Sequence, residues 1–154
     1  MPDKSVRLEQ LFPLMQEQLA SGQSVKLTPQ GTSMRPTIYG GRDQVILSPL
    51  PEKLKKYDLP LYRREDGQFV LHRIVKVGQT YTCVGDNQFI LEKGIPREWM
   101  IALTTGFIRK GKYYSTDSFA YRIYCRIWHW TRPVRHFGLR CRQAILRRLK
   151  RIFT

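Results

Sequence analysis

Apolar residues near the N-terminus recur at intervals of three and four, which is the spacing of one helix face. These residues are Leu8, Leu11, Phe12, Met15 and Leu19. Gly22 follows as a helix stop, and Pro13 places a kink or the start of the helix near itself. Residues 1–23 are therefore predicted to contain a short amphipathic helix that packs on the rest of the chain.

From residue 24 the apolar positions form short, β-branched runs separated by Gly, Pro and Asp, a pattern typical of strands. The predicted strands cover residues 25–28, 45–47, 59–62, 69–77, 81–84 and 100–108. Asp66-Gly67 predicts a hairpin turn. Strands of this length, with such turns, indicate a small, mainly antiparallel β-domain over residues 24–112, flanked by helices.

Helical spacing returns at Phe119. An aromatic-rich segment with Tyr121, Tyr124, Trp128 and Trp130 extends to about residue 131. Pro133 suits the first turn of a second helix. One face of that helix is apolar and consists of Val134, Phe137, Cys141, Ile145, Leu149 and Ile152. Residues 119–154 are thus predicted to form a basic, amphipathic helical tail.

Charge separates this tail from the β-domain. The chain has 27 Lys and Arg against 12 Asp and Glu, a net charge of +15. Residues 119–154 hold ten of these cations and no acid, so this segment favours an anionic partner. The cations predicted to contact an anionic surface are Arg126, Arg135, Arg142, Arg147, Arg148, Lys150 and Arg151.

Three interpretations of the tail remain open. Its arginines can bind lipid headgroups or nucleic acid phosphates, or they can stay in solvent while the apolar face packs on the domain. The Trp and Tyr side chains favour a membrane surface, where such rings concentrate. No recognition motif for nucleic acid is visible, so we expect an anionic membrane surface and consider nucleic acid the weaker alternative.

Several classes of protein are excluded. No apolar run reaches 18 residues, so no membrane-spanning helix is predicted. The N-terminus has no secretory signal, and the expected location is cytoplasmic or peripheral to a membrane. The three cysteines, Cys83, Cys125 and Cys141, have no CxxC spacing. We therefore expect unpaired, buried thiols, no disulfide framework, and no metal or cofactor.

Candidate chemistry is concentrated in three short motifs. Ser33 stands in Gly31-Thr32-Ser33-Met34-Arg35-Pro36, His72 precedes Arg73-Ile74-Val75, and Asp86 stands in Gly85-Asp86-Asn87. A serine hydroxyl is a weak nucleophile until a neighbouring base takes its proton. Histidine suits that role near neutral pH, and an acid can hold its ring in the required tautomer. These residue types are those of an activated serine nucleophile.

Five motifs in order resemble the catalytic domain of type I signal peptidases and their LexA-like relatives, over about residues 25–110. They are the Ser33 motif, Gly41-Arg42-Asp43, Tyr57-Asp58-Leu59-Pro60-Leu61-Tyr62, the His72 motif and Gly85-Asp86-Asn87. The resemblance implies a mixed, mostly antiparallel β-fold. It also implies a serine endopeptidase with Ser33 as nucleophile, a peptide or protein as substrate, and no cofactor.

The resemblance assigns roles to further residues. Bacterial members have a lysine as base, whereas the endoplasmic-reticulum and sporulation branch has a histidine, to which His72 corresponds. That branch also uses an acid at or soon after the Gly-Asp-Asn motif, and both Asp86 and Glu92 fit this position, so either can orient His72. Arg73 is interpreted as a partner of Asp86 or as a solvated charge. The predicted oxyanion and substrate loop consists of Gly31, Thr32, Met34 and Pro36.

Two departures from the family pattern matter. Family members often carry a serine two residues before the nucleophile, whose hydroxyl helps to bind the oxyanion, and this chain has Gly31 there. The chain also begins without the apolar anchor of such enzymes. Both departures motivate an alternative, a non-catalytic membrane-surface or peptide-binding module on the same fold.

Overall fold

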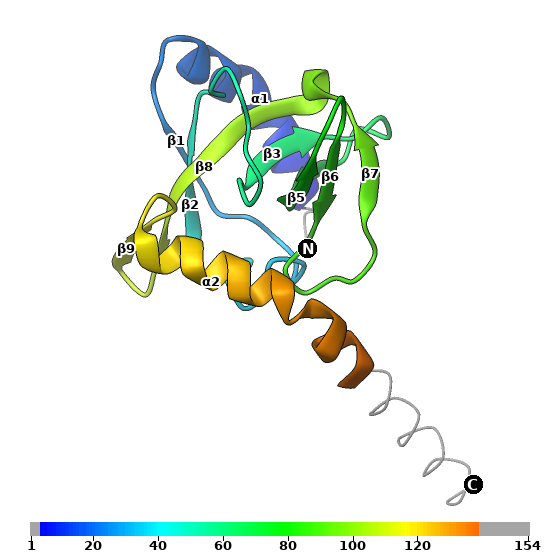
Figure 1. The fold of residues 1–154 in the computed structure, drawn as a ribbon. Helices are drawn as coiled ribbons and strands as arrows, with labels where there is room; N and C mark the ends of the chain where they lie inside the picture. The colour runs from blue at the N-terminus through cyan, green and yellow to red at the C-terminus, as the bar shows by residue number, and fades with distance from the viewer. Residues whose placement is uncertain (1–3, 139–154) are drawn as a thin grey trace, which may run out of the picture.

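Two antiparallel sheets, the helices α1 and α2 and a further helical stretch over residues 132–138 make up the computed structural model, which describes residues 4–138 (Figure 1). The prediction of a mainly antiparallel β-fold with flanking helices is confirmed. The elements are α1 (Lys4–Ala20), β1 (Val25–Leu27), β2 (Gln44–Ser48), β3 (Pro60–Arg63), β4 (Phe69–Leu71), β5 (Arg73–Val77), β6 (Tyr81–Val84), β7 (Glu92–Ile95), a 3-10 turn (Arg97–Trp99), β8 (Met100–Arg109), β9 (Lys112–Ser115) and α2 (Phe119–Trp130).

The long strand β8 organises the six-stranded sheet. Along one edge β8 pairs with β2, which in turn pairs with β1. Along the other edge it pairs with β3 near its start and with β9 near its end. β4 completes the sheet by pairing with β3 across the predicted Asp66-Gly67 turn, where the Gly67 amide donates to the Arg64 carbonyl.

The second sheet contains three strands in the order β5-β6-β7. The prediction of one continuous strand over residues 69–77 is wrong. β4 belongs to the first sheet and β5 to the second, and His72 is the single residue between them. An unbroken run of apolar and β-branched residues gives no local signal that the pairing partner changes within it.

Two clusters of buried apolar side chains hold the sheets together. The first cluster includes Leu61 and Leu71, together with Met15 and Leu19 of α1. The second includes Tyr62, which follows Leu61 in β3 and therefore points to the opposite face of that sheet. β3 is thus buried on both faces, and its neighbour β4 leads directly to His72.

α1 is longer than predicted and passes through Pro13 without ending. Met15 and Leu19 are buried, whereas Leu11 remains exposed. The predicted stop at Gly22 is confirmed, because the Gly22 amide donates to the Leu19 carbonyl after the last helical turn.

Two predicted boundaries need correction. β9 extends the β-domain to Ser115, three residues beyond the predicted limit at residue 112, because its pairing with β8 continues the sheet. α2 is confirmed as a helix, but it is part of the core rather than a separate tail, since Tyr121 and Cys125 are buried in the first cluster. Residues 132–138 are helical, and the rest of the predicted second helix lies outside the described residues.

The cysteine prediction is confirmed for Cys83 and Cys125, which are unpaired and buried; Cys141 lies outside the described residues. Within residues 4–138 no helix is both long and apolar enough to cross a bilayer.

Candidate active site

Ser33 lies in the loop that joins β1 to β2. This loop closes on itself through a hydrogen bond from the Gly41 amide to the Pro29 carbonyl (2.8 Å). Met34 and Ile38 anchor it, because their side chains are buried in the first cluster. Ser33 is itself half-buried and stands on a loop that the core holds in place.

The turn formed by Gly85, Asp86 and Asn87 packs directly against Ser33. The Asn87 amide donates to the Ser33 carbonyl (2.8 Å), and the Asn87 side chain donates to the Thr32 carbonyl (3.3 Å). A Cβ atom added to Gly85 would lie 2.6 Å from the Ser33 carbonyl oxygen and 3.1 Å from the Ser33 Cβ. Glycine is therefore required at position 85 for this close approach.

His72 lies beside the same turn. Arg73 pairs with Val84 in the register of β5 and β6, so the preceding residue His72 and the following residue Gly85 are neighbours. The tertiary structure thus brings Ser33 and His72 to the same turn, since Gly85 packs against Ser33 and follows the residue that pairs with Arg73. No hydrogen bond joins their side chains among the described residues, and free enzymes often form this contact only when substrate binds.

The Glu92 carboxylate orients the His72 ring. Its Oε1 lies 2.9 Å from Nδ1 of His72. Because an ionised carboxylate can only accept a hydrogen bond, this contact favours the neutral tautomer with the proton on Nδ1 and the lone pair on Nε2. That is the tautomer that a general base requires. Of the two acids that the sequence leaves open, Glu92 is the one that contacts His72.

Arg64 and Tyr62 hold Glu92 in place. Arg64 forms an ion pair with it, with Nε 3.0 Å from Oε2, and the Tyr62 hydroxyl donates to the same oxygen (2.9 Å). Burial by itself raises the pKa of Glu92, but these hydrogen bonds, together with the nearby charges of Arg64 and His72, keep the pKa below its ordinary value. Sequence reasoning missed both residues, since Arg64 stands 28 positions before Glu92 and no local pattern links them.

Burial keeps the pKa of the His72 ring below its ordinary value. The residue is only 3% exposed, and burial lowers the pKa of its ring although the Glu92 carboxylate opposes the shift. An NMR titration should therefore give His72 a pKa below 6.5. Glu92→Gln removes the opposing charge and should lower this pKa further. A pKa that stays unchanged or rises in the variant would contradict the contact between the two side chains.

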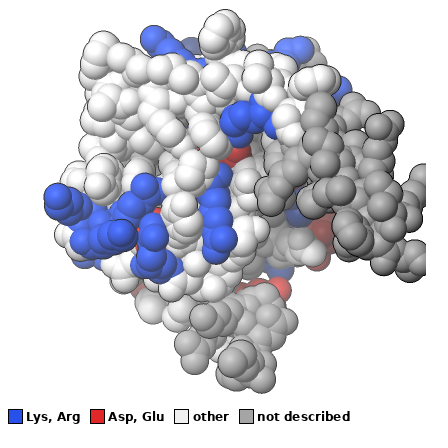
Figure 2. Space-filling view, turned by 90° about the horizontal axis from the view of Figure 1, so that it is seen from below, with Lys and Arg blue, Asp and Glu red and all other residues white. Residues whose placement is uncertain are grey.

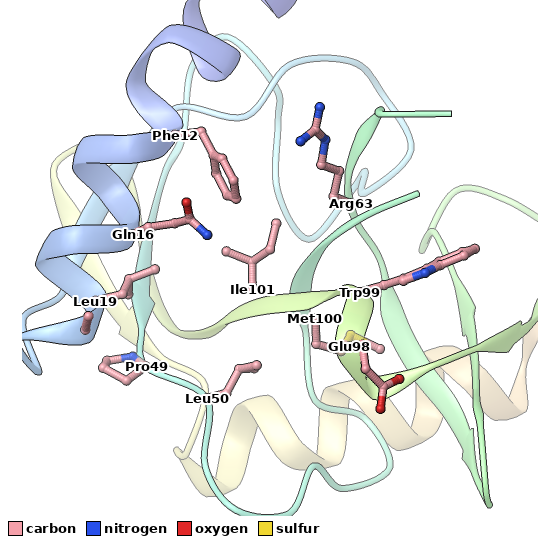
Figure 3. A pocket seen from close by; sticks show the side chains of 11 residues that line it. Phe12, Gln16, Leu19, Pro49, Leu50, Arg63, Glu98, Trp99, Met100 and Ile101 are labelled. Carbon is pink, nitrogen blue, oxygen red and sulfur yellow. The ribbon is translucent and has the colours of Figure 1, made fainter. Parts of the chain in front are cut away.

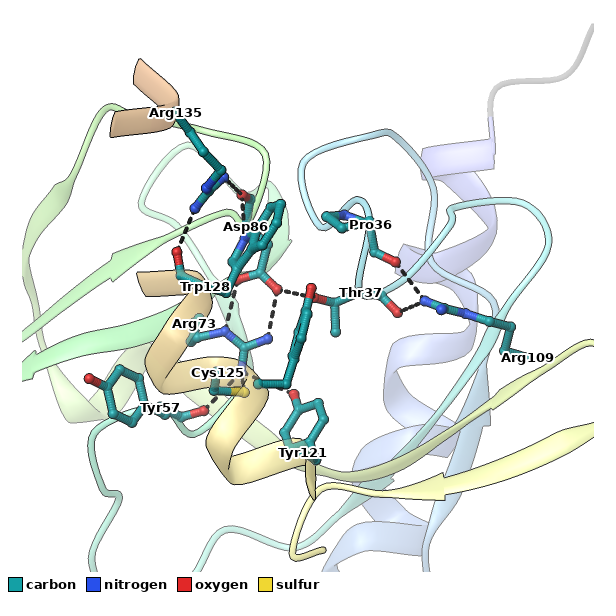
Figure 4. Close-up of polar contacts among 11 residues, drawn as sticks. Pro36, Thr37, Tyr57, Arg73, Asp86, Arg109, Tyr121, Cys125, Trp128 and Arg135 are labelled. Carbon is teal, nitrogen blue, oxygen red and sulfur yellow. Dashed lines mark hydrogen bonds and ion pairs between the residues drawn. The ribbon is translucent and has the colours of Figure 1, made fainter. Parts of the chain in front are cut away.

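The carboxylate of Asp86 binds Arg73, whereas a catalytic acid would bind His72. Its carboxylate accepts two hydrogen bonds from Arg73, from Nε (2.8 Å) and Nη2 (2.7 Å), and a further one from the Thr37 hydroxyl (Figure 4). Asp86 is 5% exposed and Arg73 is 2% exposed. The interpretation of Arg73 as a partner of Asp86 is therefore correct, and the prediction that Asp86 is a catalytic acid is corrected to a structural role.

α2 completes the surroundings of this ion pair. Nη1 of Arg73 donates to the Tyr57 carbonyl (3.1 Å), to the Tyr121 hydroxyl (3.0 Å) and to the Cys125 sulfur (2.9 Å). The Trp128 indole donates to the Asp86 carbonyl (2.9 Å), as Figure 4 shows. The helix thus fixes the turn against which Ser33 packs, a role that the sequence did not indicate.

The loop for which the sequence predicts oxyanion and substrate contacts has its side chains placed as follows. Met34 is buried, so its side chain faces the core rather than a substrate. The Pro36 carbonyl accepts a hydrogen bond from Arg109 (2.6 Å), which fixes the far end of the loop. Gly31 has φ +83°, a left-handed conformation that would strain a serine. The backbone itself therefore favours glycine where the family often has serine.

Backbone donors are available beside Ser33. Within the described residues, the amides of Thr32, Ser33 and Met34 donate to no acceptor. The Thr32 side chain is exposed. An oxyanion at this loop would therefore meet amide groups, with the Thr32 hydroxyl nearby.

The predicted anionic-surface residues divide into three sets. Arg126 is exposed on α2. Arg135 instead folds back, with its guanidinium 3.5 Å from the centre of the Trp128 ring and Nη2 donating to the Trp128 carbonyl (2.6 Å). Its assignment to the surface is corrected, because cation–π stacking and hydrogen bonding hold it against the protein. The remaining residues, Arg142, Arg147, Arg148, Lys150 and Arg151, lie outside the described residues.

A groove of about 530 Å³ lies away from these residues, between α1 and the start of β8 (Figure 3). Phe12 and Leu19 line one side, and Trp99 and Ile101 line the other. None of Ser33, His72 and Glu92 contributes to it. Among residues 4–138 no cluster of His, Cys, Asp and Glu could hold a metal ion.

Comparison with known proteins identifies no relative of this chain. No family model, no curated protein and no solved structure matches this chain. The resemblance to signal peptidases therefore depends on the five motifs alone.

Proposed function

We propose that this chain is a serine endopeptidase of the signal-peptidase-like type, with Ser33 as nucleophile, His72 as general base and Glu92 as the acid that orients it. The proposal includes the finer fold assignment, a signal-peptidase-like or LexA-like arrangement of the two sheets. The contact between Glu92 and Nδ1 of His72 carries the proposal, because it leaves Nε2 free to accept a proton.

The reaction follows from these positions. The Ser33 hydroxyl oxygen attacks the carbonyl carbon of the scissile peptide bond, while Nε2 of His72 accepts the hydroxyl proton. The tetrahedral intermediate collapses, the C–N bond breaks, and His72 gives the proton to the leaving amine. Water then attacks the Ser33 ester with His72 again as base, which releases the acid product and the free hydroxyl. The ionised Glu92 stabilises the imidazolium in both steps.

The oxyanion would be bound by the amides around Ser33, since Gly31 provides no hydroxyl. One missing donor can lower a rate by about 10²–10³. We therefore expect slow cleavage, with a rate that reaches half its maximum at the pKa of His72, on the acidic side of neutrality.

The test uses the full chain and a mixture of peptides whose cleavage products are sequenced by mass spectrometry. We expect a set of products that disappears in Ser33→Ala and persists in the matched control Ser21→Ala, which changes an exposed serine far from the site. A second readout is acylation of Ser33 by an active ester. If Ser33 is no more reactive than Ser21 and no product depends on it, the proposal is wrong.

The alternative function is a non-catalytic, peptide-binding module on the same fold. The apolar groove beside α1 favours it, because it offers aromatic and aliphatic side chains to an extended ligand. This alternative predicts that peptides bind equally well to the wild type and to Ser33→Ala, and that no peptide bond is cleaved.

A further inference from the structure

A row of apolar side chains lies exposed along α2 and the helical residues that follow it. Successive members are three or four positions apart, so the first four share one side of α2, and the last two continue the row in the helical residues 132–138. The members, which we term the outer face, are Phe119, Ile123, Ile127, Trp130, Val134 and Phe137. Their exposed fractions run from 37% for Ile123 to 82% for Trp130. An exposed apolar surface of this length marks an interaction site.

Contacts between the inner side of α2 and the rest of the fold keep the outer face directed toward solvent. Tyr121 and Cys125 on the inner side of α2 are buried and bonded to Arg73, and Trp128 is bonded to the Asp86 turn. The helix therefore cannot rotate to bury its outer face without breaking the network around Arg73. Figure 1 shows α2 running along the lower side of the molecule, beneath both sheets.

The surroundings of the outer face are basic. Arg122 and Arg126 are exposed on the same helix, and residues 119–154 contain no acid. Seen from below in Figure 2, the molecule has several patches of Lys and Arg and little acidic surface. A partner that accepts apolar side chains and carries negative charge beside them would therefore fit this face.

We propose that the outer face docks on a membrane surface that contains anionic lipid. Ile127, Trp130 and their neighbours would enter the boundary between headgroups and acyl chains, and Arg122 and Arg126 would contact lipid phosphates. Trp130 suits this depth, since tryptophan concentrates at membrane interfaces. A nucleic acid duplex stacks its bases on one another and offers mainly phosphates to this face, and a second copy docked face to face would bring the same arginines together.

Docking in this way would place the candidate active site near the membrane. α2 contacts the Asp86 turn through Trp128, and this turn packs against Ser33. The docking itself does not depend on peptidase activity, so Ser33→Ala should bind membranes as the wild type does.

The test measures cosedimentation of the full chain with vesicles of phosphatidylcholine and phosphatidylglycerol in equal parts, and with pure phosphatidylcholine. We expect binding to the first and at least about tenfold weaker binding to the second, because each cation near an anionic surface adds about fivefold in affinity. The double variant Ile127→Glu/Trp130→Glu should bind the anionic vesicles at least tenfold more weakly. The matched control is Leu11→Glu/Leu14→Glu, which changes two residues of α1 that are 52% and 54% exposed.

Fluorescence locates the contact. Trp99 and Trp128 are half-buried, whereas Trp130 is exposed, so lipids brominated in their acyl chains should quench mainly Trp130. Trp130→Phe should remove most of that quenching while the protein still binds.

Three results would overturn the proposal. The first is no binding to anionic vesicles. The second is equal binding by the Ile127→Glu/Trp130→Glu variant, which would assign binding to other parts of the chain. The third is that the wild type does not bind vesicles but self-associates or binds duplex DNA, and that this variant does neither. That result would assign the outer face to a second copy or to nucleic acid.

Discussion

Replacing Glu92 by glutamine should slow Ser33-dependent cleavage by about 10³–10⁴-fold. The physical reason is the tautomer of His72: a glutamine amide can donate to Nδ1, which moves the ring proton to Nε2 and removes the lone pair that accepts the Ser33 proton. Loss of the corresponding acid in a serine protease triad has an effect of this size. The measurement is the initial rate of product formation for a peptide that the wild type cleaves.

The matched control for this prediction is Glu98→Gln, which makes the same chemical change on an exposed residue. Its rate should stay within about twofold of the wild type, in line with the small effect of most surface substitutions. A Glu92→Gln rate within a few-fold of the wild type would refute the proposed role of Glu92. Thermal unfolding of both variants shows whether a lost rate reflects a lost fold, since glutamine can still bond to Arg64.

Replacing Asp86 by asparagine should lower the free energy of unfolding by about 3–5 kcal/mol, because it leaves the buried charge of Arg73 without its counter-charge. That is a large part of the stability of an ordinary domain, about 5–15 kcal/mol. The melting temperature should fall by roughly 10 °C or more. Chemical denaturation followed by tryptophan fluorescence measures the loss, and Asp117→Asn, on an exposed acid, should leave stability nearly unchanged.

A double variant separates the ion pair from general damage to the turn. Arg73→Met/Asp86→Leu removes both charges and keeps apolar bulk, so it should be more stable than either single variant. If the double variant is as unstable as the sum of the singles, the two charges do not depend on each other. The loss at Asp86 would then arise from its hydrogen bond with Thr37.

The sequence predicts the secondary structure of some parts of this protein better than that of others. The alternation of apolar residues located most strands within one or two residues, because one buried face repeats every second position. It missed β7 and β9, whose residues Glu92–Ile95 and Lys112–Ser115 are largely polar and pair at sheet edges. It also predicted β4 and β5 as one strand. The pairing partner changes at His72, but the run of apolar and β-branched residues is continuous there and gives no signal of the change.

The sequence predicts the candidate site only in part as well. The motifs identify Ser33 and His72 as a hydroxyl and an imidazole of the right types, and they restrict the acid to Asp86 or Glu92. The choice between these acids depends on which carboxylate meets Nδ1 of His72, and only the pairing of β6 with β7 brings Glu92 there. Asp86 instead forms an ion pair with Arg73. Burial strengthens this ion pair, and no spacing rule in the sequence predicts it.

The amino-acid sequence by itself determined the class of the fold, the presence of a helix before and after the β-domain, the uneven charge and the residue types at the candidate site, because each depends on local periodicity or composition. Only the tertiary structure decided that Ser33 and His72 both lie at the Gly85 turn, that Glu92 contacts the imidazole, and that α2 packs its inner side and exposes its outer face. These features arise from contacts between segments far apart in the chain, whose free energy depends on close packing and burial rather than on neighbouring residues.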